Sequence, residues 1–277
     1  MSARDHEWQY NPRVTTPDSA RYRERAEAES AATRERLAFA GDIAYGERPE
    51  STLDLFPGTP GGPAHLFLHG GYWRGRDKRD FSFVAAPLVE IGTTVLVANY
   101  QLCPAATLRE IIAQTADLLA ALPGLAERHG FDASRVIASG HSAGAHLLAA
   151  AMSAPEHRAR TAGSVRSLVL VSGIFDLTPV PAISVNEEIR LDPGDVTALS
   201  PMAMDPPEGV AMDIVVGGAE SPGWIAQSAL YAEKCQLAGV DADFLVAPCE
   251  NHSSIMETYA DAASPLFARL SALPGFA

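Results

Sequence analysis

Residues 135–152 read RVIASGHSAGAHLLAAAM. The first five residues form an apolar run of strand length, and the last eight are rich in alanine and leucine, which favour a helix. Between them, the segment Gly140-His141-Ser142-Ala143-Gly144 predicts a sharp turn that has small residues on both sides of a serine. A hydroxyl at the tip of such a strand–turn–helix unit is placed to act as a nucleophile.

Apolar runs of strand length alternate with longer helical stretches on both sides of this unit, and a short strand over 52–56 precedes them. The runs lack polar alternation, as expected for strands that helices cover on both faces. We therefore predict an α/β fold with a mostly parallel, doubly wound sheet of about eight strands, and ligands at the carboxyl ends of the strands. The expected strands are 64–68, 94–98, 135–139, 168–172, 213–216 and 243–247, and the expected helices are 81–91, 108–129, 143–152, 223–238 and 254–270.

The chain has 277 residues, which fits one large α/β domain. We expect residues 1–50 to form a helical extension, because 18–39 is rich in Arg, Glu and Ala; this helix is either largely solvated or an arm over the body of the protein. Residues 51–277 are expected to form the catalytic domain. Within it, the proline-containing stretch 176–205 is too long for a simple loop and predicts a cap-like insertion.

Composition narrows the range of partners. The net charge of −13 disfavours nucleic acid and anionic membrane surfaces. Three widely spaced cysteines indicate neither a disulfide framework nor a zinc site, so we expect no metal and no cofactor. The N-terminus lacks the apolar core of a signal peptide, and no run approaches the roughly 18 to 20 apolar residues of a membrane span. We expect a cytoplasmic protein that acts on a small molecule; a homodimer is one assembly that the sequence permits.

A serine needs a base to remove its proton, and histidine is the usual one. His252 follows the last expected strand, where a loop can carry an imidazole over the strand ends. The other seven histidines are interpreted as surface, packing or hydrogen-bonding residues. Cys249, the competing nucleophile, lies at the end of an apolar strand without a separate base, and is interpreted as a buried structural cysteine.

The histidine in turn needs a carboxylate that fixes its tautomer. Glu220 is the first acid after the strand 213–216, which is the expected position. Asp176, after the strand that follows the nucleophile, is the rival. The other nearby acids, Asp213, Asp241 and Asp243, lie at the wrong ends of their strands.

Acyl transfer also needs backbone N–H groups that face the developing oxyanion. The segment 69–73, HGGYW, ends the strand 64–68, and its glycines let the backbone approach a substrate closely. We expect the amides of Gly71, Tyr72 and Ala143 to form an oxyanion hole.

With these residues placed, the chain resembles the kynurenine formamidase (arylformamidase) branch of the α/β-hydrolases, near the hormone-sensitive-lipase-like esterases. The resemblance extends over nearly the whole chain. The matching segments are Tyr10-Asn11-Pro12-Arg13, Tyr45-Gly46, 69–74 with Lys78, 81–85, 140–146, 172–179, Asn186, 199–201, 217–222 with Gln227-Ser228, and Asn251-His252.

The resemblance implies a triad of Ser142, Glu220 and His252, with a structural or cap role for the Asp176 segment. The chain departs from the family at two places. Gly223-Trp224 stands where the family commonly has an acid followed by phenylalanine, and Ser253 stands where an aromatic residue is frequent. Both departures would border the pocket, whose wall we assign to Gly70, Trp73, His141, Trp224 and Ser253, and they affect the substrate rather than the mechanism.

The implied activity is cofactor-independent removal of a small acyl group, such as formyl, from an aryl amine such as N-formylkynurenine, a step of tryptophan catabolism. Tyr72 and Trp73 would then wall a narrow acyl pocket. A carboxylesterase for short-chain or aryl esters uses the same machinery and is the alternative. A non-catalytic binding protein on this scaffold is disfavoured, because no triad member is missing.

Overall fold

The computed structural model describes residues 3–16, 18–273 and 275. Its centre is an eight-stranded sheet of order β1-β2-β4-β3-β5-β6-β7-β8. Strands β3 to β8 run parallel, whereas β2 pairs antiparallel with both β1 and β4. The predicted α/β fold with a mostly parallel sheet is confirmed. The strands are β1 (Ala40–Ala44), β2 (Thr52–Phe56), β3 (Ala64–Leu68), β4 (Thr94–Ala98), β5 (Val136–His141), β6 (Ser167–Val171), β7 (Ala211–Gly217) and β8 (Ala242–Ala247).

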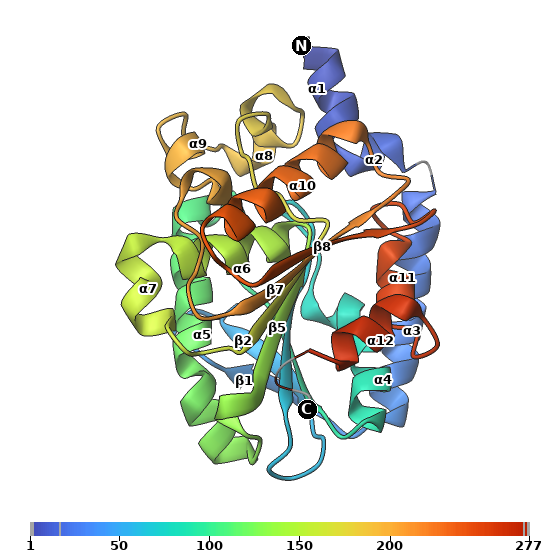
Figure 1. Cartoon of the computed structure of the whole chain (residues 1–277). Helices are drawn as coiled ribbons and strands as arrows, with labels where there is room; N and C mark the ends of the chain where they lie inside the picture. Colours follow the sequence, from blue (N-terminus) through green and yellow to red (C-terminus); the bar gives the residue numbers. More distant parts are fainter. Residues whose placement is uncertain (1–2, 17, 274, 276–277) are drawn as a thin grey trace.

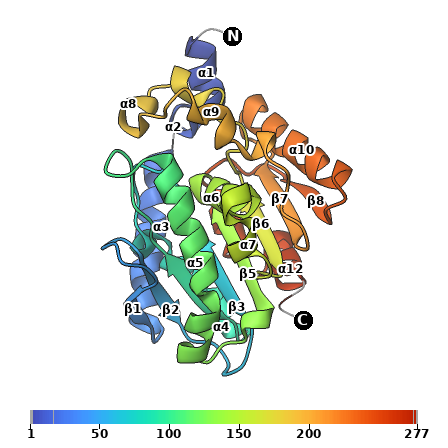
Figure 2. The same cartoon turned by 90° about the vertical axis from the view of Figure 1, so that its left-hand side faces the viewer.

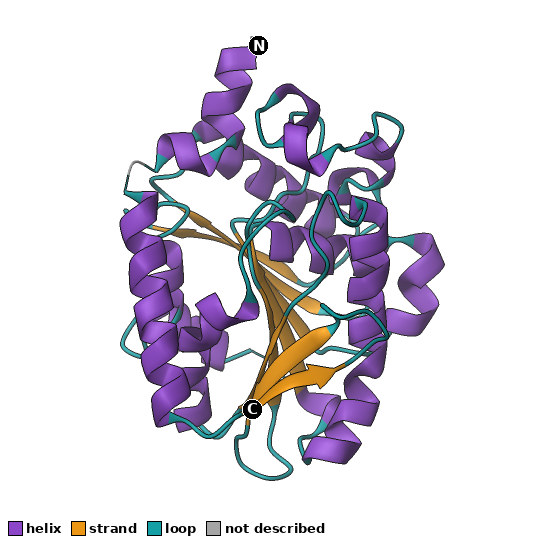
Figure 3. Cartoon of the chain, turned by 180° about the vertical axis from the view of Figure 1, so that it is seen from behind, coloured by secondary structure: helices purple, strands orange, loops and turns teal. Residues whose placement is uncertain are grey.

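Helices cover both faces of the sheet (Figures 1 and 3). On one side lie α5 (Leu108–His129), α6 (Ala143–Ser153), α7 (Pro155–Thr161) and α10 (Pro222–Leu237); on the other lie α3 (Ser19–Arg36), α4 (Ala85–Glu90), α11 (Ile255–Tyr259) and α12 (Pro265–Ser271). Successive strand residues reach opposite cores: Leu66 and Leu68 of β3 belong to the first, and Phe67 to the second. This double burial explains why the strand sequences lack polar alternation.

The remaining short elements are α1 (Ala3–Tyr10), α2 (Pro12–Thr15), η1 (Lys78–Val84), η2 (Ala133–Arg135), η3 (Val180–Ala182), α8 (Asn186–Ile189), α9 (Asp195–Ala198) and η4 (Pro201–Ala203).

Several expected elements differ in detail. The expected helix 81–91 is the 3₁₀ helix η1 followed by α4. The expected helix 254–270 is divided into α11 and α12, because Ser264 caps a new helix whose first residue is Pro265. The sequence pattern did not predict α7.

The N-terminal region is not a separate extension. Residues 40–44 form β1, which pairs with β2 at the edge of the sheet, so the expected boundary at residue 50 divides one sheet. Helix α1 also contacts the 176–205 insertion, since Glu7 accepts hydrogen bonds from the backbone N–H (2.8 Å) and hydroxyl (2.7 Å) of Ser184. Figure 2 shows α1 and α2 beside α8 and α9 at the same end of the molecule.

A buried ion cluster holds this N-terminal region against the body. Asp54 on β2 has no exposed surface, and its carboxylate accepts hydrogen bonds from Lys78 Nζ at 2.7 Å and from Arg34 of α3. Lys78, which begins η1 and is 1% exposed, also donates to Asp42 Oδ1 at 2.5 Å. The charges of β2, α3 and η1 therefore compensate one another around the buried pair of Asp54 and Lys78, while Arg34 and Asp42 extend from this pair to the surface.

Removal of one ion from this cluster should destabilise the fold. We expect Lys78→Met to lower the free energy of unfolding by about 3–5 kcal/mol, because Asp54 would stay buried without one of its two cationic partners. Urea titration followed by circular dichroism measures the change. The neighbouring exposed Arg79, 3.8 Å from Asp42, provides the matched control: Arg79→Met should change stability by less than about 1 kcal/mol. Equal effects of the two substitutions would contradict the buried cluster.

Candidate active site

Ser142 lies at the turn between β5 and α6. Its backbone has φ 54° and ψ −113°, a region that residues other than glycine seldom adopt, and its N–H donates to Val171 O of β6 at 2.8 Å. The turn requires close approach of α6 to β3: a Cβ at Gly144 would lie 2.1 Å from Leu68 O. Only glycine fits there, which explains the small residues around the serine in the sequence.

His252 lies between β8 and α11, and its ring meets a carboxylate from the preceding loop. Nδ1–H of His252 donates to Glu220 Oε2 at 2.7 Å. In a neutral imidazole this bond selects the tautomer with its proton on Nδ1, so that Nε2 is the nitrogen able to accept a proton.

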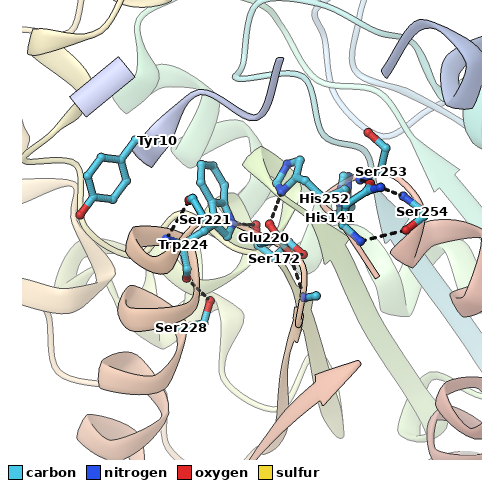
Figure 4. Close-up of polar contacts among 12 residues, drawn as sticks. Tyr10, His141, Ser172, Glu220, Ser221, Trp224, Ser228, His252, Ser253 and Ser254 are labelled. Atoms are coloured by element: carbon cyan, nitrogen blue, oxygen red, sulfur yellow. Dashed lines mark hydrogen bonds and ion pairs between the residues drawn. The ribbon is translucent and has the colours of Figure 1, made fainter. Parts of the chain in front are cut away.

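Glu220 follows β7 and is almost completely buried, with 2% of its side chain exposed. Its other oxygen, Oε1, accepts a hydrogen bond from Ser172 Oγ at 2.5 Å (Figure 4). It also accepts one from Gly217 N–H at 2.8 Å. Three donors thus hold the carboxylate in one orientation and compensate for its burial. Ser172, just after β6, is a site residue that the sequence analysis missed, although its position at a strand end was a usable signal.

Asp176, the rival acid, is not the partner of His252. Its carboxylate accepts the N–H of Thr178 at 2.8 Å and stabilises a local turn. The structure therefore places Glu220, and not Asp176, against the imidazole.

Ser142 and His252 line one cavity of 190 Å³. Within the described part of the chain, Ser142 Oγ has no hydrogen-bond partner, so the hydroxyl and the imidazole share the cavity without a bond between them. A hydrogen bond between a nucleophile and its base often tightens only when a substrate is bound.

His141, which precedes the serine, supports the histidine loop. Its Nε2–H donates to the backbone carbonyl of His252 at 2.8 Å, and the two ring centroids are 4.8 Å apart. Burial, together with the neighbouring His252 imidazole, holds the pKa of His141 well below its usual value, so that it stays neutral. His141 also lines the cavity, as expected.

The loop after β3 faces the serine from the other side. Gly71, Tyr72 and Trp73 have φ values of 128°, 52° and 56°, an unusual succession that turns the backbone toward the cavity. A side chain at Gly71 would clash with Gly75 O at 2.2 Å. The N–H groups of Gly71, Tyr72 and Ala143 have no backbone acceptor among the described residues, which leaves them free for a ligand.

The N-terminal segment ties this loop to the loop that carries Glu220. The Tyr72 hydroxyl donates to the backbone carbonyl of Tyr10, and the Ser221 hydroxyl donates to that of Gln9. Gly223 N–H donates to Gln9 Oε1 at 2.6 Å. Residues 9 and 10 therefore bridge two loops that are about 150 residues apart in sequence.

Trp73 and Trp224, which were expected to line the cavity, lie behind the residues that line it. Trp73 has no exposed surface and packs on His146, with ring centroids 4.8 Å apart, because Tyr72 takes the side of the loop that faces the cavity. Trp224 in the first turn of α10 donates its indole N–H to Ser172 O at 2.8 Å, and its ring lies 4.6 Å from that of His252 (Figure 4). Among the described residues the cavity lining includes Gly70, Gly71, Tyr72 and Ser253 but neither tryptophan, so both act as packing behind the site.

The remaining lining comes from the N-terminal region, the loop between β3 and η1, η1 itself and α11. These residues are Asn11, Pro12, Arg13, Ser19, Tyr22, Arg23, Ala26, Arg74, Arg76, Phe81, Phe83 and Met256. Helix α3 thus acts as the arm that the sequence analysis considered. No residue of 176–205 lines this cavity in the described structure; the insertion instead supports α1.

Cys249 differs from its interpretation. It is exposed, two residues beyond the end of β8, with φ 65°, and is not a buried structural cysteine.

Among the described residues no group of His, Cys, Asp and Glu side chains is arranged to hold a metal ion. No described helix is both long and apolar enough to cross a membrane.

Known proteins are similar to this chain over most of its length. Kynurenine formamidase of Danio rerio is 28% identical over 228 residues, which span 79% of this chain and 76% of the relative. That of Drosophila melanogaster is 29% identical over 225 residues, or 78% of this chain and 71% of the relative.

Solved structures of this fold include a candidate thioesterase from Silicibacter sp. TM1040, with a TM-score of 0.82, 32% identity and coverage of 95% of this chain and 97% of that one. An esterase of Pyrobaculum calidifontis, at 17% identity, has a TM-score of 0.73 with 92% of both chains covered, which shows the fold alone. The family model described as the alpha/beta hydrolase fold matches residues 65–256, from β3 to α11. The chain is therefore a hydrolase and belongs to the α/β-hydrolase family.

Proposed function

We propose that this hydrolase is an arylformamidase that removes the formyl group from an aryl amine such as N-formylkynurenine. The observation that carries the proposal is the meeting of Ser142 and a Glu220-oriented His252 at one small cavity, which the loop with the unbonded N–H groups of Gly71 and Tyr72 also lines. The kynurenine formamidases that resemble the chain over most of its length support the formyl group as the acyl part.

In the proposed mechanism, Ser142 Oγ attacks the formyl carbon while its proton passes to Nε2 of His252. The N–H groups of Gly71, Tyr72 and Ala143 stabilise the oxyanion. The imidazolium then gives its proton to the departing aryl amine, and Ser142 keeps the formyl group as an ester. Water, deprotonated by His252, attacks this ester and releases formate, which restores the serine hydroxyl. Glu220 keeps the imidazole in the required tautomer throughout.

The cavity supports a small substrate. Its 190 Å³ is below the roughly 300–1,000 Å³ of pockets for drug-sized ligands. Phe81, Phe83 and Met256 give it an apolar wall, against which one aromatic ring can pack.

A carboxylesterase for short-chain or aryl esters is the second candidate. Esterases are among the solved structures that share the fold, and an ester is attacked by the same groups with an easier leaving group. The acyl-transfer machinery does not distinguish the two, so the distinction depends on the pocket.

The first test compares kcat/KM on N-formylkynurenine with kcat/KM on phenyl acetate. We expect turnover of both, with the higher value for the formamide, and Ser142→Ala should lower kcat for both by roughly 10⁶-fold. A folded Ser142→Ala protein with unchanged kcat would refute the nucleophile. Ester turnover without detectable formamide turnover would favour the carboxylesterase.

The second test asks which carboxylate orients His252. Glu220→Gln should lower kcat by roughly 10³- to 10⁴-fold, because the neutral amide no longer stabilises the imidazolium or selects its tautomer. Asp176→Asn is the matched control, since this carboxylate caps a turn; its kcat should stay within about threefold of wild type. Assays with either substrate decide the point, and a larger effect at Asp176 would overturn the assignment.

A further inference from the structure

The cavity lining has a charge opposite to that of the whole protein. The chain carries 34 acidic and 21 basic residues, yet the described lining includes four arginines and no Asp or Glu. The arginines are Arg13, Arg23, Arg74 and Arg76. A concave site with one sign of charge attracts ligands of the other sign, so this cavity favours an anion.

Three of these arginines already have acidic partners outside the cavity. Arg76 lies 3.0 Å from Glu27 and 3.3 Å from Asp80, and its guanidinium covers the ring of Phe81. Arg74 pairs with Glu188 of the insertion. Arg23 lies 3.8 Å from Glu27. These ion pairs hold the three arginines in position and neutralise part of their positive charge.

Arg13 differs from the other three. Within the described part of the chain, its guanidinium has no carboxylate within 4 Å and no hydrogen-bond acceptor. Partial burial and the repulsion of Arg74 lower the pKa of Arg13, and the attraction of Glu188 only partly offsets them, so an anion beside the guanidinium would relieve repulsion that remains.

The backbone at Arg13 is nevertheless well anchored. Asn11 Oδ1 accepts the N–H of Arg13 at 3.2 Å, and Asn11 Nδ2 donates to Glu7 Oε1 at 2.6 Å. The guanidinium is thus presented from a fixed turn at the wall of the cavity, with its donors unused. Such a planar group is suited to a carboxylate, which it can bind through two parallel hydrogen bonds.

We propose that Arg13 is a specificity-determining residue that binds a carboxylate on the substrate, and that the enzyme selects aryl substrates that carry a carboxylate over those that lack one. The aromatic ring would pack on Phe81, Phe83 and Met256 while its carboxylate pairs with Arg13. The inference rests on the proposed acyl-transfer function and adds the charge of the substrate to it. Since no acid lines the described cavity, an additional ammonium group gains no partner.

The test uses pairs of substrates that differ only in charge. 4-Formamidobenzoate is compared with 4-formamidobenzamide, and 4-acetoxybenzoate with 4-acetoxybenzamide, so that each carboxylate has a neutral analogue of nearly the same shape. We expect wild-type kcat/KM to favour each carboxylate by about 10- to 100-fold, as for a charge-assisted hydrogen bond in a partly enclosed site. The preference should decrease as ionic strength rises.

Arg13→Gln should reduce this ratio to near one, and Arg13→Glu should invert it. The control is Arg21→Gln: Arg21 is an exposed arginine of α3 that does not line the cavity, and the wild-type ratio should persist. A wild-type ratio near one, or an equal loss in Arg13→Gln and Arg21→Gln, would overturn the inference. A carboxylate preference on the ester pair without any formamide turnover would support it while refuting the arylformamidase proposal.

Discussion

The site depends on the close approach of α6 to β3. Gly144 lies against the carbonyl of Leu68 at a distance that admits no side chain, and Ser142 reaches its unusual backbone conformation only because the helix begins there. This one steric constraint sets the position of the serine hydroxyl and of the Ala143 amide. It also brings them opposite the loop that follows β3, because β3 and β5 are neighbours in the sheet. The serine and the candidate oxyanion-binding amides are therefore consequences of a single packing contact.

The charged groups of the site are buried only where hydrogen-bond donors compensate for their burial. Glu220 is surrounded by donors from Ser172, Gly217 and His252, which compensate for its burial and keep its orientation. Trp224 closes the space behind the imidazole with its ring and holds Ser172 by its indole N–H. The residues behind the site thus determine the tautomer and direction of the groups that face the cavity.

The N-terminal region is part of the site as well as of the fold. The ion cluster of Asp54, Lys78 and Arg34 fixes α3 and η1, which supply Tyr22, Arg23, Phe81 and Phe83 to the cavity. Residues 9 and 10 join the loop after β3 to the loop that carries Glu220. The segment that distinguishes this chain from a bare hydrolase domain therefore encloses the substrate side of the cavity, and its arginines give that side a positive charge.

The sequence by itself determined the parallel sheet, the serine turn, and the order of serine, acid and histidine, because these depend on local period, on small residues at tight turns and on positions relative to strand ends. It predicted Glu220 over Asp176 from position along the chain, but the 2.7 Å contact with His252 that decides between the two acids belongs to the tertiary structure. The sequence also did not place Trp73 and Trp224 behind the wall, or Arg13 on it, since hydropathy does not record which side of a loop or of a helix end faces a cavity. Those features were decided by tertiary structure, because contacts between segments far apart in the chain determine which side chains meet.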